Sequence, residues 1–175
     1  MRFKPSYLVL GLPGHPLHPP LTDATIGTYT VATVLAVVDA AGISDTTAAH
    51  GWWLCLLVGL IFTVPTAATG LADWLRLTWG SEIWKTASLH LVVMVSATVF
   101  FLLAAVFGHD DWRAANVSGG ELALTVIGWV LLLAGGWLGG TIVFVHGMRV
   151  LNLLQEPFGR ASAPVPHPEK EMAEG

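Results

Sequence analysis

Long apolar runs with few charged residues dominate the chain. Three of them carry no Asp, Glu, Lys or Arg and cover residues 51–72, 86–108 and 122–148. Each run exceeds the roughly 20 residues that a helix needs to cross the hydrocarbon core of a bilayer. None of the runs shows the strict apolar–polar alternation of a membrane β-barrel strand. The pattern therefore predicts transmembrane helices.

A fourth and weaker span is expected over residues 21–38, which are rich in threonine. Pro19 and Pro20 directly before it suit the start of a helix. The predicted fold is an all-α membrane protein, a four-helix transmembrane bundle with up-down-up-down topology. Its spans are expected near residues 21–41, 50–72, 86–108 and 121–150. Beyond the two hairpins that four spans imply, no long internal repeat is evident.

The four spans form one predicted transmembrane domain over residues 21–154, with a short segment on either side. Residues 1–20 are rich in His and Pro, and Pro16, Pro19 and Pro20 predict a stiff, extended surface segment around His15 and His18 rather than a regular helix. Residues 155–175 are polar and rich in Pro and Ala, which predicts a disordered tail.

The distribution of positive charge predicts the orientation. Of the eight Lys and Arg residues, all but Arg113 fall in the N-terminal segment, in the loop between the second and third spans, or in the tail. Because cytoplasmic loops carry the excess of Lys and Arg, both termini are expected in the cytoplasm. The chain is 54% hydrophobic and 11% charged with no long basic block, so the lipid bilayer is its expected environment and nucleic acid is not expected as a partner.

Histidines stand out because ionisable side chains are costly inside a membrane. His90 and His146 each lie a few residues inside the end of an apolar run, and both are expected at the cytoplasmic side with His15, His18 and Asp73. Helical spacing from His18 places four further polar residues on one face of the first span: Thr22, Thr25, Tyr29 and Thr33. Since polar side chains in lipid favour interhelical partners, this stripe is expected to face into the bundle.

Glycines share the predicted face of His146, at Gly139 and Gly135. Spacing of the GxxxG type lets another helix, or a flat ligand, approach the backbone closely. Plain helix packing is the more common reason for such a pair.

Three functions follow from this pattern. In the first, His90 and His146 are the axial ligands of a haem b, Gly135 and Gly139 make room for the ring, and the protein transfers electrons with a quinone or a redox protein partner. In the second, His18, His90 and His146, with His15 or Asp73, hold a transition metal ion such as zinc, copper or iron. In the third, the chain is a ligand-free structural or assembly subunit. In each case the sequence is compatible with a homo-oligomer. Without a nucleophile motif, an enzyme is not expected.

Two segments of the chain resemble motifs of a known family. GHPLHPPLTDATIG at residues 14–27 and GGWLGGTIVFVHGMRV at residues 135–150 are similar to the opening and closing motifs of a bacterial membrane-protein family, domain of unknown function 2231. The resemblance covers residues 12–152 and implies a multi-pass protein of the bacterial inner (cell) membrane with unassigned activity. Some relatives are joined to Rieske-type iron–sulfur domains, which implies redox chemistry, but this chain has no such domain and Cys55 is its single cysteine. His15, His18 and His146 match the motifs by position, and no catalytic residue is implied.

Overall fold

Four long helices make up the computed structural model, which describes residues 9, 11, 15–44 and 46–148. They are α2 (His18–Ala40), α3 (Thr47–Trp74), α4 (Glu82–Ala114) and α5 (Gly119–Phe144). Each contains a segment that is long and apolar enough to cross a membrane. The predicted four-helix transmembrane fold is thus confirmed, while the predicted tail at residues 155–175 lies outside the described residues.

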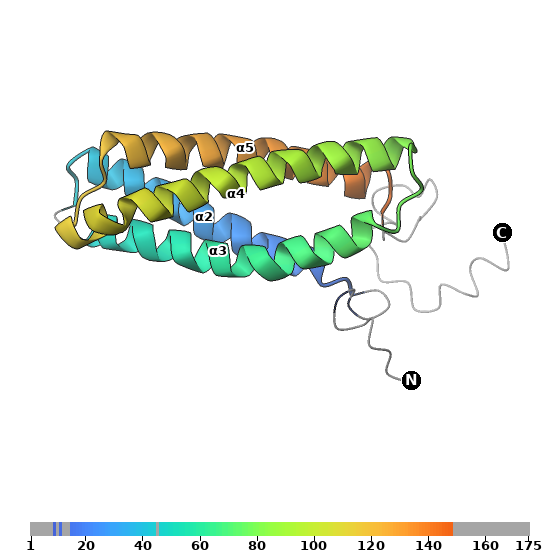
Figure 1. The fold of residues 1–175 in the computed structure, drawn as a ribbon, viewed down its shortest axis with the longest axis horizontal. Coiled ribbons are helices and arrows are strands. Elements are labelled where there is room, and N and C mark those ends of the chain that lie inside the picture. Colours follow the sequence, from blue (N-terminus) through green and yellow to red (C-terminus); the bar gives the residue numbers. More distant parts are fainter. Residues whose placement is uncertain (1–8, 10, 12–14, 45, 149–175) are drawn as a thin grey trace, which may run out of the picture.

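The helices form an up-down-up-down bundle of two hairpins (Figure 1). Helix α2 packs chiefly against α3, and α4 packs chiefly against α5. Helices α2 and α4 begin at the end of the bundle where α3 and α5 finish, and α2 lies diagonally across from α4. This end carries His18, Asp73, His90 and His146, and we call it the histidine-rich end. His50 and His109 lie at the opposite end.

Large apolar side chains lie on the outside of the bundle and several polar ones lie inside, as a lipid environment favours. Large apolar side chains are exposed on the outer faces of all four helices, for example Val34, Ile61, Val92 and Trp137. Among the described residues, seven polar or charged ones are buried instead: Thr25, Thr33, Thr66, Thr69, Asp73, Glu121 and Thr125. Because lipid tails solvate apolar surfaces as well as another helix does, small residues and interhelical hydrogen bonds hold such a bundle together.

Helix α2 begins at His18, so the expectation of an extended segment through this residue is wrong. Pro19 and Pro20 occupy the first turn of the helix. Their missing N–H groups cost nothing there, because the first N–H groups of a helix have no intrahelical partner, and the proline φ angle is already helical. The prolines therefore start the helix and place His18 on it.

Helix α5 ends earlier than the predicted span at residues 121–150. The chain leaves the helix after Phe144, and Gly147 adopts a φ of +66° that side chains rarely tolerate. The backbone N–H of His146 donates to the carbonyl of Thr141 at 3.1 Å, which closes the helix. His146 therefore lies in a turn beyond the helix rather than inside it.

The two hairpins share a pattern of burial that the sequence does not display as a repeat of residue types. Residues 72 positions apart on α2 and α4 have matching burial, as in the pairs Thr25 and Ala97, Tyr29 and Phe101, Ala32 and Ala104. On α3 and α5 the same holds at a separation of 69 positions, for instance for Gly59 and Gly128 or Thr66 and Gly135. Few of these pairs are identical, because the repeat preserves side-chain size and burial rather than residue type.

An aromatic pair lies where the two hairpins meet. The rings of Tyr29 and Phe101 stack with centroids 3.9 Å apart and planes at 4°. Gly59 of α3 lies behind the Tyr29 ring, and Gly128 of α5 lies behind the Phe101 ring. Tyr29 and Phe101 are thus equivalent residues in mutual contact, and each has an equivalent glycine behind its ring. We infer an approximate two-fold axis that runs along the bundle between the two rings.

Candidate functional site

His90 is held against the backbone of α5. Its Nδ1 lies 2.8 Å from the carbonyl oxygen of Gly135. A carbonyl only accepts hydrogen bonds, so Nδ1 carries the hydrogen and donates it. In the neutral ring the lone pair is then on Nε2, the nitrogen that is able to ligate a metal. Among the described residues the ring makes no second hydrogen bond.

Glycines on α5 provide the space for this arrangement. A Cβ atom added to Gly139 would lie 3.4 Å from Cε1 of His90, and one added to Gly135 would meet the side chain of Met94. The glycine face predicted for α5 therefore contacts two side chains of α4. In this structure it serves close helix packing and positions His90.

His18 has the same kind of contacts in the first hairpin. Its Nδ1 lies 3.0 Å from the carbonyl oxygen of Thr66 and 3.2 Å from Oγ1 of Thr69, both on α3. A Cβ atom added to Gly70 would lie 2.7 Å from Cε1 of His18. The carbonyl again requires the hydrogen on Nδ1 and leaves the lone pair on Nε2.

The polar stripe predicted from His18 faces into the bundle. Thr25, Tyr29 and Thr33 are all buried. The Thr25 hydroxyl lies 3.0 Å from that of Thr66, and the Tyr29 hydroxyl lies 2.9 Å from that of Thr63. The prediction is confirmed for these three residues, whereas Thr22 is half-buried and its hydroxyl donates to the His18 carbonyl at 2.9 Å. The Thr25 and Tyr29 hydroxyls join α2 to α3.

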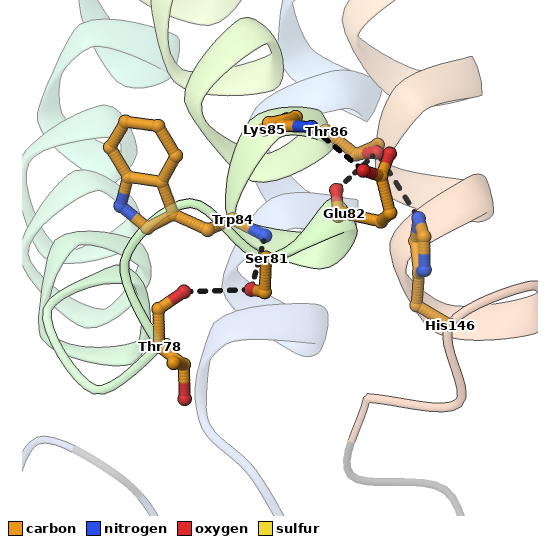
Figure 2. A network of polar contacts seen from close by, with 7 residues as sticks. All are labelled: Thr78, Ser81, Glu82, Trp84, Lys85, Thr86 and His146. Carbon is orange, nitrogen blue, oxygen red and sulfur yellow. Dashed lines mark hydrogen bonds and ion pairs between the residues drawn. The ribbon is translucent and has the colours of Figure 1, made fainter.

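His146 contacts α4 near the start of that helix, at Thr86, as Figure 2 shows. Its Nε2 lies 3.1 Å from Oγ1 of Thr86, which also donates to the carbonyl of Glu82 at 3.1 Å. Thr86 precedes His90 by four residues, so the contact lies about 6 Å nearer the helix start. Within the described residues no hydrogen bond joins the His90 and His146 rings. The observed contact of His146 fastens the end of α5 to the start of α4.

We expect the His146–Thr86 contact to stabilise the bundle modestly. In a double-mutant cycle of His146→Ala and Thr86→Ala, the coupling should be about 0.5–1 kcal/mol, as is usual for hydrogen bonds between membrane helices. Reversible unfolding in detergent or bicelles measures it. Thr98→Ala is the matched control, because the Thr98 hydroxyl donates within its own helix to Met94. Coupling between His146 and Thr98 equal to that with Thr86 would contradict the assignment.

The remaining predicted ligands, Asp73 and His15, lie at the same end of the bundle. Asp73 is buried near the end of α3, and His15 is exposed ahead of α2. In the described part of the chain, no three residues among His, Cys, Asp and Glu lie close enough to hold a metal ion together. The structure thus gathers His18, Asp73, His90 and His146 at one end without forming the predicted three- or four-ligand ion site.

Sequence reasoning missed the groups that orient the histidines. Thr66 and Gly135 contribute main-chain oxygens, which no sequence motif reports. The spacing nevertheless holds a clue: each residue whose carbonyl accepts from a histidine is followed four positions later by the glycine that lies against the same ring, as Thr66 by Gly70 and Gly135 by Gly139.

Comparison with known families agrees with the fold. Residues 14–152 match the family described as "Predicted membrane protein (DUF2231)". The match includes both motifs on which the resemblance was based. No curated protein and no solved structure matches the chain.

Proposed function

We infer, from the premise that this chain belongs to the predicted-membrane-protein family DUF2231, that it binds haem b at the histidine-rich end and carries electrons within the membrane. The observation that supports this proposal is the geometry of His90. Its ring is fixed in one tautomer by the Gly135 carbonyl at 2.8 Å, in a low-charge part of a transmembrane bundle.

An Nδ1–H bond to a carbonyl is the usual second contact of a histidine that ligates a metal. It orients the ring and raises the basicity of the ligating nitrogen. Neutral imidazole is also the commonest protein ligand of haem iron. A half-buried ring that is oriented in advance loses less conformational freedom on binding, which favours a bound group over a plain packing role.

Small residues let both imidazoles lie close against the backbone of the neighbouring helices, in a low-charge part of the bundle that suits a largely apolar group. The helix faces around the two histidines present small residues at Thr66, Gly70, Gly135 and Gly139. Arg76 and Lys85 are exposed at the same end, where they would neutralise haem propionates; Lys85 already pairs with Glu82 at 2.7 Å. When bound, haem would supply a one-electron couple, exchanging single electrons with a quinol or quinone or with a redox protein.

The orientation of the bundle belongs to the same proposal. Arg76 lies in the loop between α3 and α4 and Lys85 in the first turn of α4, both at the histidine-rich end, whereas Arg113 lies near the end of α4 on the opposite side. The positive-inside rule then places the histidine-rich end in the cytoplasm of a bacterial cell, with the chain in the inner membrane. Electrons would be exchanged at the cytoplasmic side.

Absorption spectroscopy tests the haem proposal. The protein, produced in a host supplied with a haem precursor and purified in detergent, should show a Soret band and, after reduction by dithionite, sharpened visible bands. We expect His90→Ala to lose most of the Soret absorbance, because the iron loses an oriented ligand. His109→Ala is the matched control, since His109 is exposed at the opposite end of the same helix.

Two outcomes would contradict the proposal. One is a wild-type protein without a Soret band even after incubation with hemin. In that case elemental analysis separates a bound transition metal ion, which would support the ion-binding alternative, from a ligand-free structural subunit. The other is a Soret band unchanged in His90→Ala, which would remove His90 from the site.

A further inference from the structure

The internal repeat identifies a partner for His90, and it is a different residue from the one expected from the sequence. Resting on the proposed haem function, we propose that His18 is the second axial ligand, so that His18 and His90 form a bis-imidazole site on the approximate two-fold axis of the bundle.

The first argument is position within the repeat. His18 and His90 are 72 positions apart, the same separation as Tyr29 and Phe101, which stack on the axis. Each histidine lies eleven residues before its aromatic residue and on the same helix face, since eleven residues are close to three helical turns. The two imidazoles therefore occupy equivalent places on α2 and α4, on opposite sides of the axis.

The second argument is that both rings are oriented by the same device. The Nδ1–H of His18 donates to the Thr66 carbonyl at 3.0 Å, and that of His90 donates to the Gly135 carbonyl at 2.8 Å. Thr66 and Gly135 are themselves equivalent positions of the repeat. Packing alone needs no common tautomer, whereas two ligands of one iron both need Nε2 as the coordinating atom.

A third argument comes from the glycines beside the rings. Gly70 contacts Cε1 of His18, and the equivalent Gly139 lies against Cε1 of His90. A Cβ atom would come within 2.7 Å of the His18 ring at Gly70, so a larger residue there would displace the ring. Both hairpins therefore orient their histidine by a carbonyl and a glycine of the neighbouring helix, although the carbonyl belongs to Thr66 in the first hairpin and to Gly135 in the second.

The axis matters because a haem iron takes its two axial ligands from opposite faces of a flat ring. Histidines on diagonal helices meet that requirement. His146 does not fit as well. It lies in the turn after α5, its Nε2 contacts Thr86 at 3.1 Å, and its equivalent position in the first hairpin is Leu77.

Electron paramagnetic resonance and near-infrared magnetic circular dichroism of the ferric protein test the ligand pair. The wild type should give the low-spin signature of two imidazole ligands. We expect His18→Ala and His90→Ala each to lose at least nine-tenths of that signal, with the residual haem becoming high-spin. His146→Ala should retain it, because we assign this residue to helix packing.

Rescue separates a lost ligand from a misfolded protein. Free imidazole added to haem-loaded His18→Ala should restore the low-spin spectrum, since it fills the vacated coordination position; a failure of rescue in a protein that keeps its haem would count against His18. A low-spin bis-imidazole signal that survives in His18→Ala and disappears in His146→Ala would overturn the pair while leaving the haem function intact. Wild-type protein that takes up no haem overturns both.

Discussion

Replacing Trp52 by alanine should destabilise the bundle more than any other single truncation, by about 3–5 kcal/mol. Trp52 is the largest side chain with no exposed surface, and its ring fills the space beside Gly108 of α4. Its indole Nε1 donates to the Thr125 hydroxyl on α5 at 3.1 Å. One side chain of α3 therefore contacts both helices of the second hairpin.

The expected loss follows from packing rather than from hydrophobic transfer, because a membrane helix that separates from its neighbours stays in lipid. Removing the indole leaves a cavity whose walls lose their dispersion contacts, and it removes one interhelical hydrogen bond. Steric trapping or reversible denaturation in bicelles measures the free energy of unfolding. Trp137→Ala is the matched control: Trp137 is 81% exposed on α5, so its truncation should change stability by less than about 0.5 kcal/mol. Equal effects of the two substitutions would show that the core is not where we place it.

The second large effect is expected at Gly59, where alanine should cost about 1–3 kcal/mol through overpacking. An added Cβ would lie 2.5 Å from Cε1 of Tyr29. The Tyr29 ring has no direction in which to move, because it stacks on Phe101 at 3.9 Å and its hydroxyl contacts Thr63 at 2.9 Å. Helices α2 and α3 must therefore separate.

Gly136→Ala provides the comparison for this substitution. Gly136 lies in the interior of α5, and a Cβ added there meets nothing within 4 Å. Alanine in a helix interior is favoured over glycine by about 0.5–1 kcal/mol, so Gly136→Ala should be neutral or stabilising. If Gly59→Ala were equally well tolerated, the close approach of α3 to the Tyr29 ring, and with it the stacked pair on the axis, would be in doubt.

These aromatic contacts also bear on the histidine site. Tyr29, Phe101, Trp52, Leu56 and Leu132 have at most 2% exposed surface and fill the bundle beyond the two histidines. A group bound between His18 and His90 would therefore be limited on one side by the Tyr29–Phe101 pair. Its polar edge would face the histidine-rich end, where Arg76 and Lys85 are exposed.

Much of the fold was predictable because a bilayer imposes a simple rule. An uncharged run of about 20 residues has few alternatives to a transmembrane helix, since only a helix satisfies its backbone groups within lipid. The same reasoning predicted the threonine stripe of α2 and the gathering of His18, Asp73, His90 and His146 at one end, because alternating helices fix the depth of each residue. The match over residues 14–152 agrees with the motifs identified from the sequence.

The helix ends were less predictable. Proline at residues 19 and 20 was taken to exclude His18 from a helix, but a first turn tolerates proline. Helix α5 ends at Phe144, before His146, and Gly147 turns the chain in a left-handed conformation, so the contact of His146 lies at another depth than that of His90. Both differences arise from backbone conformations of single residues, which hydropathy does not describe.

Hydropathy, charge and spacing determined by themselves that the chain crosses the membrane four times and which ionisable residues share one end. Only the tertiary structure decided which of these residues occupy equivalent positions in the two hairpins. The two-fold repeat is carried by burial, by small residues beneath aromatic and imidazole rings, and by the main-chain oxygens of Thr66 and Gly135. Every residue has a main-chain carbonyl, so the sequence does not indicate which carbonyl accepts from a histidine. The packing and relative depth of two helices select it, and both are properties of the assembled bundle.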